Sequence, residues 1–154
     1  MKPTLIFLIA CVAGPLLSAH ASAGTSAAVR EAEADAQVAF RHGDYPAAIR
    51  LYEDCRTQTP NNVLLLTNLG LAYFQNNQLA AAAQTLRRAV ELAPKEEVAH
   101  RALGVVCYWQ RDDAGAVGAL QKALALDPGD AVARKYLALA HTRQGDKRRA
   151  PARP

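Results

Sequence analysis

Residues 63–96 read VLLLTNLGLAYFQNNQLAAAAQTLRRAVELAPKE, and this stretch decides the fold of the 154-residue chain. Its pattern returns once further along the chain, with Leu69, Gly70, Tyr73, Ala82, Leu86, Ala89 and Pro94 matched by Leu103, Gly104, Cys107, Ala116, Leu120, Ala123 and Pro128. A fixed period of about 20–50 residues is typical of a chain built from one repeated supersecondary unit. The sequence therefore predicts an array of similar units.

Each unit is expected to be a pair of helices joined by a tight turn. Apolar residues in 64–74 cover a face too broad for one interface, which is typical of a helix packed between two neighbours. Gly70 and Ala82 are small enough to let two antiparallel helices approach closely. The two asparagines at 76–77 favour a turn, and Pro94 ends the second helix because it has no N–H to donate. No sustained alternation of apolar and polar residues indicates a strand, so the fold class is expected to be all-α.

The order L-G-x-x-Y, then A-x-x-x-[FL]-x-x-A, then Pro, at a period of about 34 residues, resembles the tetratricopeptide repeat (TPR). The resemblance implies a solenoid of antiparallel helix pairs over residues 29–146. We expect about three repeats and a C-terminal capping helix, at residues 29–62, 63–96, 97–130 and 131–144.

Both ends of the array depart from the repeat. In the first repeat, the residues that stand where Leu, Gly and Tyr are expected are Asp35, Ala36 and Ala39. A polar helix over about residues 29–41 is typical of a terminal cap. At the other end, the Gly-Asp pair at 145–146 predicts a turn. Pro151 and Pro154 prevent a second helix after it, so the unit that begins at 131 is expected to close the array.

Residues 1–23 resemble a secretory signal peptide. Lys2 precedes an apolar run over residues 5–17, and A-x-A patterns end at Ala21 and Ala23, where cleavage is expected. Residues 24–28 would then form a flexible lead, and the mature protein would be exported to a bacterial periplasm. Two alternatives stay open: an uncleaved anchor, although the run is shorter than the roughly 20 residues that span a bilayer, and a lipid on Cys11, because residues 8–11 resemble a lipoprotein box.

Positive charge gathers at the C-terminal end, where residues 131–154 hold one acidic residue, Asp146, and seven basic ones, Arg134, Lys135, Arg143, Lys147, Arg148, Arg149 and Arg153. A basic tail over residues 147–154 can contact anionic lipid or an acidic partner, or it can simply be solvated. Membrane contact is expected only through this tail or the signal segment. Nothing indicates a nucleic-acid partner.

The exported chain offers no set of residues suited to catalysis or to metal binding. Beyond the signal region the single serine is Ser26, and the remaining histidines, His42, His100 and His141, occupy non-equivalent positions of different repeats. We therefore expect no enzyme, no cofactor and no metal, with His100 as a packing residue. The repeat register places Cys55 and Cys107 too far apart for a disulfide, so both are expected to be buried free thiols.

The resemblance also implies where a partner binds. In TPR proteins the first helix of each repeat lines the concave face through its second, fifth, sixth, ninth, twelfth and thirteenth residues. Some members hold a peptide C-terminal carboxylate there, and Asn68 matches one asparagine of that clamp. The other clamp positions do not match, because they carry Glu33, Gln37, Val98 and Ala102.

The groove expected from these positions is largely apolar. It consists of Leu64, Asn68, Leu71, Phe74, Val98, Arg101, Val105, Tyr108, Trp109, Tyr136 and Leu139, and further apolar residues at the same positions are Phe40 and Val132. Phe40, Phe74 and Tyr108 are at least as well suited to packing between helices. Leu71, Val105 and Leu139 lie 34 residues apart, at the ninth position of three successive units, and are expected to form one stripe.

These residues predict a protein–protein interaction scaffold that binds an apolar helix or peptide in the groove. It resembles the TPR subunits that serve envelope assemblies such as pili, secretion systems or cytochrome maturation. The alternative is a membrane-associated accessory protein, lipid-anchored or signal-anchored, that uses its basic C-terminal tail.

Overall fold

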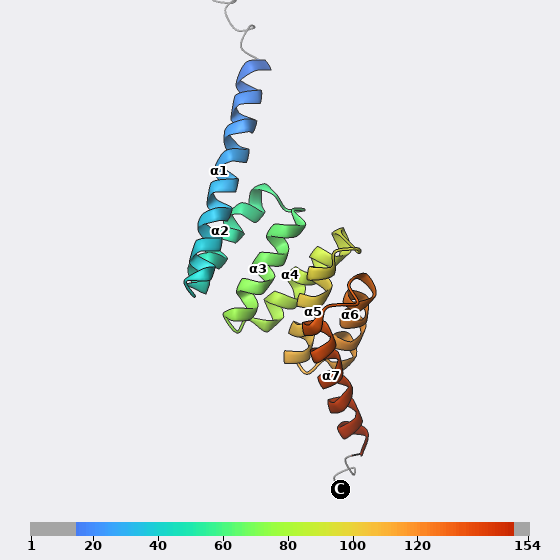
Figure 1. Cartoon of the computed structure of the whole chain (residues 1–154). Helices are drawn as coiled ribbons and strands as arrows, with labels where there is room; N and C mark the ends of the chain where they lie inside the picture. The colour runs from blue at the N-terminus through green and yellow to red at the C-terminus, as the bar shows by residue number, and fades with distance from the viewer. Residues whose placement is uncertain (1–14, 150–154) are drawn as a thin grey trace, which may run out of the picture.

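The computed structural model describes the backbone of residues 15–149 and the side chains of residues 27–145. This part of the chain is all helix, as predicted, and holds no strand. Successive helices pack as antiparallel pairs, α1 with α2, α3 with α4 and α5 with α6, and the last helix closes the row (Figure 1). The helices are α1 (Pro15–Arg41), α2 (Tyr45–Gln58), α3 (Val63–Gln75), α4 (Leu79–Leu92), α5 (Glu97–Trp109), α6 (Asp113–Leu126) and α7 (Ala131–Arg149).

Three equivalent left-handed residues turn the chain inside each pair. They are Gly43, Asn77 and Arg111, with φ of 80°, 58° and 66°, and each occupies the same position of its repeat. After each of them the next N–H donates back to a carbonyl in the last turn of the first helix, as from Gln78 to Tyr73 at 2.8 Å. This is the Schellman arrangement, which satisfies carbonyls that the helix end leaves unpaired. The predicted turn at residues 76–77 is confirmed.

The two helices of a pair approach each other at a glycine. A Cβ atom added to Gly70 would lie 2.6 Å from Cγ of Leu86, and one added to Gly104 would lie 2.5 Å from Cγ of Leu120. Real Cβ atoms do not come this close to another carbon, so the α3–α4 and α5–α6 contacts require glycine at these positions. The predicted role of Gly70 is thereby confirmed.

The core consists of two main clusters of buried side chains. The N-terminal cluster joins α1, α2 and α3 around Tyr52, Leu65 and Leu69. The C-terminal cluster joins α4 to α7 around Leu86, Leu120 and small residues that bring the helices together. Tyr73 of α3 packs against both clusters. Each fully buried large apolar side chain stabilises the fold by about 1.5–3 kcal/mol relative to an exposed one.

His100 and the two cysteines of the core are buried, as the sequence predicted. His100 is buried, and its Nε2 lies 2.9 Å from the carbonyl oxygen of Pro94, so it packs against the loop between α4 and α5 as expected. Cys55 belongs to the N-terminal cluster and Cys107 to the C-terminal cluster, and both thiols are free and buried.

The structure contradicts the predictions made for both ends of the repeat domain. Residues 24–28 do not form a separate lead, because α1 runs through them from Pro15. Extending an existing helix adds one hydrogen bond per residue without a new nucleation step, and alanine favours it. The turn predicted at residues 145–146 is also wrong, since α7 continues to Arg149. No further helix packs beyond it in the described chain, so nothing forces a turn, and the predicted basic tail begins as helix. Residues 1–14, with most of the proposed signal segment and Cys11, lie outside the described residues.

Arg143 fixes α7 to the rest of the solenoid. Its Nη2 donates to the carbonyl oxygen of Tyr108 at 2.7 Å, its guanidinium lies 4.0 Å from the centre of the Tyr108 ring, and it forms an ion pair with the buried Asp113 of α6. By sequence, Arg143 counts among the basic residues of the C-terminal end. The structure makes it a packing residue instead, with only 16% of its side chain exposed.

Candidate functional site

The residues predicted for the groove lie together on three neighbouring helices. α5 packs against both α3 and α7, so their first-helix positions form one surface, which we call the inner face. It consists of Leu64, Asn68, Leu71 and Phe74 of α3, Val98, Arg101, Val105, Tyr108 and Trp109 of α5, and Tyr136 and Leu139 of α7. None of these residues is fully buried.

Three apolar side chains of the inner face are open to solvent. The exposed fractions are 64% for Leu64, 54% for Trp109 and 39% for Leu139, and Val132 beside them on α7 is 47% exposed. None of the four belongs to a core cluster. The four side chains belong to α3, α5 and α7, helices that pack side by side, and we interpret them as parts of an interaction surface.

A row of aromatic rings crosses the inner face from α3 to α7. The ring centres of Phe74 and Trp109 lie 6.4 Å apart, those of Trp109 and Tyr108 6.3 Å, and those of Tyr108 and Tyr136 5.4 Å. These separations are typical of favourable aromatic pairs. The row therefore holds Trp109 in place while leaving more than half of it accessible.

Other predicted groove residues serve the fold as well. Leu71, Phe74, Tyr108 and Tyr136 pack against the C-terminal cluster, and Phe40 packs in the same way against the N-terminal one. For Phe40, Phe74 and Tyr108, packing between helices is at least as strong an expectation from the sequence as contact with a partner. The residues of the predicted stripe therefore differ in exposure, because Leu71 packs against the core and Leu139 is exposed.

Arg101 is occupied by structural contacts. Its Nη1 lies 3.0 Å from Glu97 and 3.2 Å from Asp130, which also accepts hydrogen bonds from the N–H groups of Val132 and Ala133 and so caps α7. Burial alone would raise the pKa of Asp130, but the Ala133 N–H and the Arg101 guanidinium outweigh it and hold that pKa below its usual range. Burial raises the pKa of Glu97.

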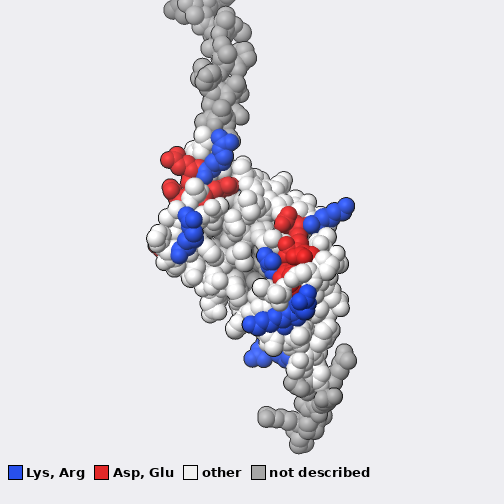
Figure 2. Space-filling view, in the orientation of Figure 1, with Lys and Arg blue, Asp and Glu red and all other residues white. Residues whose placement is uncertain are grey.

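Charge is distributed unevenly around this surface. Figure 2 shows charged side chains gathered over α1 and α2 and again over α5 to α7, with an uncharged area between them. α3 itself contains no Lys, Arg, Asp or Glu. The middle of the array therefore offers an apolar and uncharged surface.

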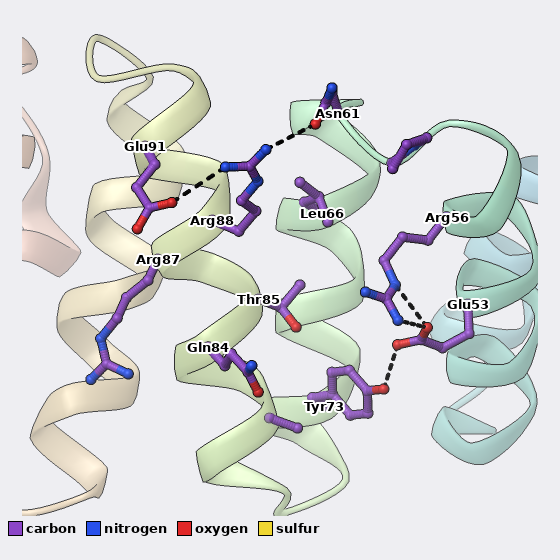
Figure 3. A pocket seen from close by; sticks show the side chains of 12 residues that line it. Glu53, Arg56, Asn61, Leu66, Tyr73, Gln84, Thr85, Arg87, Arg88 and Glu91 are labelled. Atoms are coloured by element: carbon purple, nitrogen blue, oxygen red, sulfur yellow. Dashed lines mark hydrogen bonds and ion pairs between the residues drawn. The ribbon is translucent and has the colours of Figure 1, made fainter.

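A second concave feature, which sequence analysis missed, lies between α2 and α4. We call it the outer groove, and Figure 3 shows it floored by Leu66 and Tyr73 of α3. It encloses about 700 Å³, and its lining is Glu53, Arg56, Pro60, Asn61, Leu66, Tyr73, Ala81, Gln84, Thr85, Arg87, Arg88 and Glu91. The signal that could have revealed it is Arg56, because the equivalent residues of the next two repeats are Val90 and Leu124.

Hydrogen bonds organise the outer groove. Glu53 accepts from Nε of Arg56 at 2.8 Å and from the Tyr73 hydroxyl at 2.5 Å, while Nη2 of Arg88 donates to Asn61 at 3.1 Å. Burial, followed by this bond to Glu53, raises the pKa of Tyr73 to about 12. Both walls thus present an arginine beside an apolar floor.

The described residues contain neither a metal-binding cluster nor a membrane-spanning helix. Within residues 27–145, no three His, Cys, Asp or Glu side chains lie close enough to hold a metal ion. No helix in the described part of the chain is both long and apolar enough to cross a membrane.

Comparisons with known proteins agree with this architecture. Residues 33–97 match the family described as "Tetratricopeptide repeat". No curated protein matches the chain significantly. Among solved structures, the Sgt2 TPR domain from Aspergillus fumigatus superposes with a TM-score of 0.76 at 23% identity, covering 82% of this chain and 85% of that one.

Two further structures extend the comparison. The first TPR of Spaghetti (RPAP3), bound to the HSP90 peptide SRMEEVD, has a TM-score of 0.74 at 23% identity and covers 76% of this chain and 93% of that one. The MamA protein has a TM-score of 0.72 at 28% identity, with 76% of this chain covered and 64% of MamA. With its helices paired in this order and its turns in one repeat register, the described chain has the all-α solenoid fold seen in the solved tetratricopeptide-repeat structures.

Proposed function

We propose that this chain is a protein-interaction scaffold whose inner face binds an apolar helix or an extended apolar peptide. The observation that carries the proposal is the exposure of Leu64, Trp109 and Leu139 on three adjacent helices. These side chains add little to the core, whereas each can contribute about 1–2 kcal/mol to the binding of an apolar partner. The first TPR of Spaghetti binds a peptide, which supports a peptide partner here as well.

The proposed ligand differs in chemistry from an acidic chaperone tail. Two of the clamp positions hold Glu33, which accepts a hydrogen bond from Asn62 at 3.1 Å, and Ala102, which is buried. Neither side chain is able to donate to a carboxylate. An apolar segment fits the inner face better, since its affinity comes from burying area rather than from charge.

We place this scaffold in the bacterial periplasm, as an accessory subunit of an envelope assembly. The supporting observations are the apolar N-terminal run and the two A-x-A patterns that end at Ala21 and Ala23. A membrane-associated form, anchored by a lipid on Cys11 or by an uncleaved signal segment and aided by the basic tail, is the alternative. The intact mass of the exported protein separates the two, because cleavage near Ala23 removes Cys11 and lipidation adds the mass of acyl chains to it.

Pull-down from periplasm tests the binding proposal, with the wild type and two variants as the bait proteins. The wild type is expected to recover a partner, and a Leu64→Asn, Leu139→Asn double variant is expected to lose it by about tenfold or more while keeping its helicity. An Arg148→Ser, Arg149→Ser variant should retain it with weaker salt dependence. If the double Asn variant recovers the same partner and the tail variant does not, the binding site lies at the basic end.

The fluorescence of the single tryptophan of the chain can report directly whether a partner is bound to the inner face. Trp109 is the only Trp in the sequence and lies in the aromatic row of the inner face. Binding of an apolar segment should move its fluorescence emission to shorter wavelength, because the ring leaves water. An unchanged emission spectrum in the presence of a partner that does bind would contradict the proposed site.

A further inference from the structure

We propose that the outer groove between α2 and α4 is a second binding site, which takes an extended acidic peptide segment of a partner protein. Its walls come from α2 and α4, the second helices of their repeats, which contribute no residue to the inner face, and its floor comes from α3 (Figure 3). Its volume of about 700 Å³ falls within the usual range of binding sites.

The repeat register shows that the first repeat differs from the others at this groove. At the twenty-eighth position of each repeat, Val90 and Leu124 are half-buried and pack against the C-terminal cluster. The first repeat has Arg56 there, and 48% of its side chain is exposed. At this position the other two repeats use an apolar side chain for packing, whereas the first repeat directs an arginine into a groove.

The groove has more hydrogen-bond donors than its own acceptors use. Both oxygens of Glu53 are engaged, one by Arg56 and the other by the Tyr73 hydroxyl. Arg56 makes these contacts through Nε and Nη2, which leaves Nη1 directed elsewhere. Arg88 has a longer ion pair, 3.5 Å to Glu91 at the rim, and half of its side chain is exposed. A guanidinium has five N–H groups, so each arginine keeps donors for a ligand.

Spare donors on both walls favour carboxylates, because arginine pairs with them through two parallel hydrogen bonds. Leu66, Ala81 and Pro60 supply an apolar strip on which the backbone and aliphatic parts of an extended segment can lie. Arg87 is not part of this arrangement, since Figure 3 shows its side chain directed away from Arg56 and Arg88. The chain's own C-terminal residues are excluded as the occupant by their positive charge.

Fluorescence anisotropy with a defined probe tests the site. The probe is a fluorescein-labelled, C-terminally amidated peptide of about eight residues in which Asp alternates with Val, so that it is extended and carries only side-chain carboxylates. A matched peptide with Asn in place of Asp reports on binding without charge. Binding of the acidic peptide is expected to weaken as salt is raised.

The protein variants exploit the repeat register. Arg56→Val restores the residue type of the other repeats, so the fold is expected to survive, and the affinity for the acidic peptide should fall about fivefold or more. Arg88→Gln should do the same. Arg50→Gln is the control, because Arg50 is exposed on α2 but does not line the groove.

The outcomes distinguish this site from the inner face. The Leu64→Asn, Leu139→Asn variant should bind the acidic peptide as well as the wild type does, whether or not the inner face binds an apolar partner. Failure of the wild type to bind the acidic peptide, or equal binding of the Asn-containing peptide, overturns the proposal. So does a loss with Arg50→Gln that matches the loss with Arg56→Val, because the peptide would then respond only to net charge.

Discussion

Substitution of Gly70 by alanine tests the closest helix contact of the solenoid. The added Cβ would stand 2.6 Å from Cγ and 2.8 Å from Cδ2 of Leu86, a side chain with no exposed surface. Overpacking of this kind typically destabilises by about 1–3 kcal/mol. Alanine also favours a helix interior over glycine by about 1 kcal/mol, so the net loss in the free energy of unfolding should be about 0–2 kcal/mol.

Gly118 of α6 is the matched control, since a Cβ added there meets nothing within 4 Å. Gly118→Ala should raise the free energy of unfolding by about 0.5–1 kcal/mol, which gives the two Gly→Ala changes different outcomes. Urea denaturation followed by circular dichroism measures both. In a Leu86→Ala background the contact is gone, and Gly70→Ala should become neutral or stabilising. If Gly70→Ala stabilises the wild type as much as Gly118→Ala does, the close approach of α3 and α4 is refuted.

Further predictions concern the turns, the last helix, acid stability and the thiols. Arg111→Gly should raise the free energy of unfolding by about 0.5–1 kcal/mol, because a left-handed residue with a Cβ is strained; a fall in the urea midpoint would contradict this. Arg143→Met should lower the melting temperature by roughly 10 °C through loss of a mostly buried ion pair worth about 2–4 kcal/mol, and an unchanged melting curve would argue against the anchoring role. The pKa of Asp130 is lower in the folded protein than in the unfolded chain, so Asp130 stabilises the fold above its unfolded pKa and stops doing so as pH falls through its folded pKa. The difference in free energy of unfolding between the wild type and Asp130→Asn should therefore disappear below about pH 4. Because burial raises the pKa of both Cys55 and Cys107, iodoacetamide should modify them only after unfolding, and non-reducing mass spectrometry should find no bridge between them.

Most of the architecture could be predicted from the repeat period of the sequence. The recurrence of Gly70 at Gly104 and the turn at residues 76–77 were enough to predict helix pairs, because each feature depends on local geometry. Arg111 replaces the usual glycine, yet its φ of 66° shows that the repeat imposes the left-handed turn on whichever residue stands there. Local constraints of this type are visible in a single sequence.

The end of the array and the outer groove depend on contacts between residues far apart in the chain. Gly145 occupies the register of the turn residues, but α7 runs through it because no partner helix follows in the described chain. Arg143 could be recognised as an anchor only once Tyr108 and Asp113 were seen beside it. For the inner face, the register located the candidate residues, and the structure added which of them are accessible, such as Leu64, and which pack, such as Leu71.

The boundary between the two core clusters also governs how the protein comes apart. The N-terminal cluster and the Tyr73–Glu53 hydrogen bond hold α1 and α2 on α3, so loss of these contacts would let the α1–α2 pair open as a cooperative unit while α4 to α7 stay folded. Such an opening removes one wall of the outer groove. A peptide bound between α2 and α4 would therefore slow amide hydrogen exchange in the part of α1 that packs on the N-terminal cluster, although α1 contributes no residue to the groove lining.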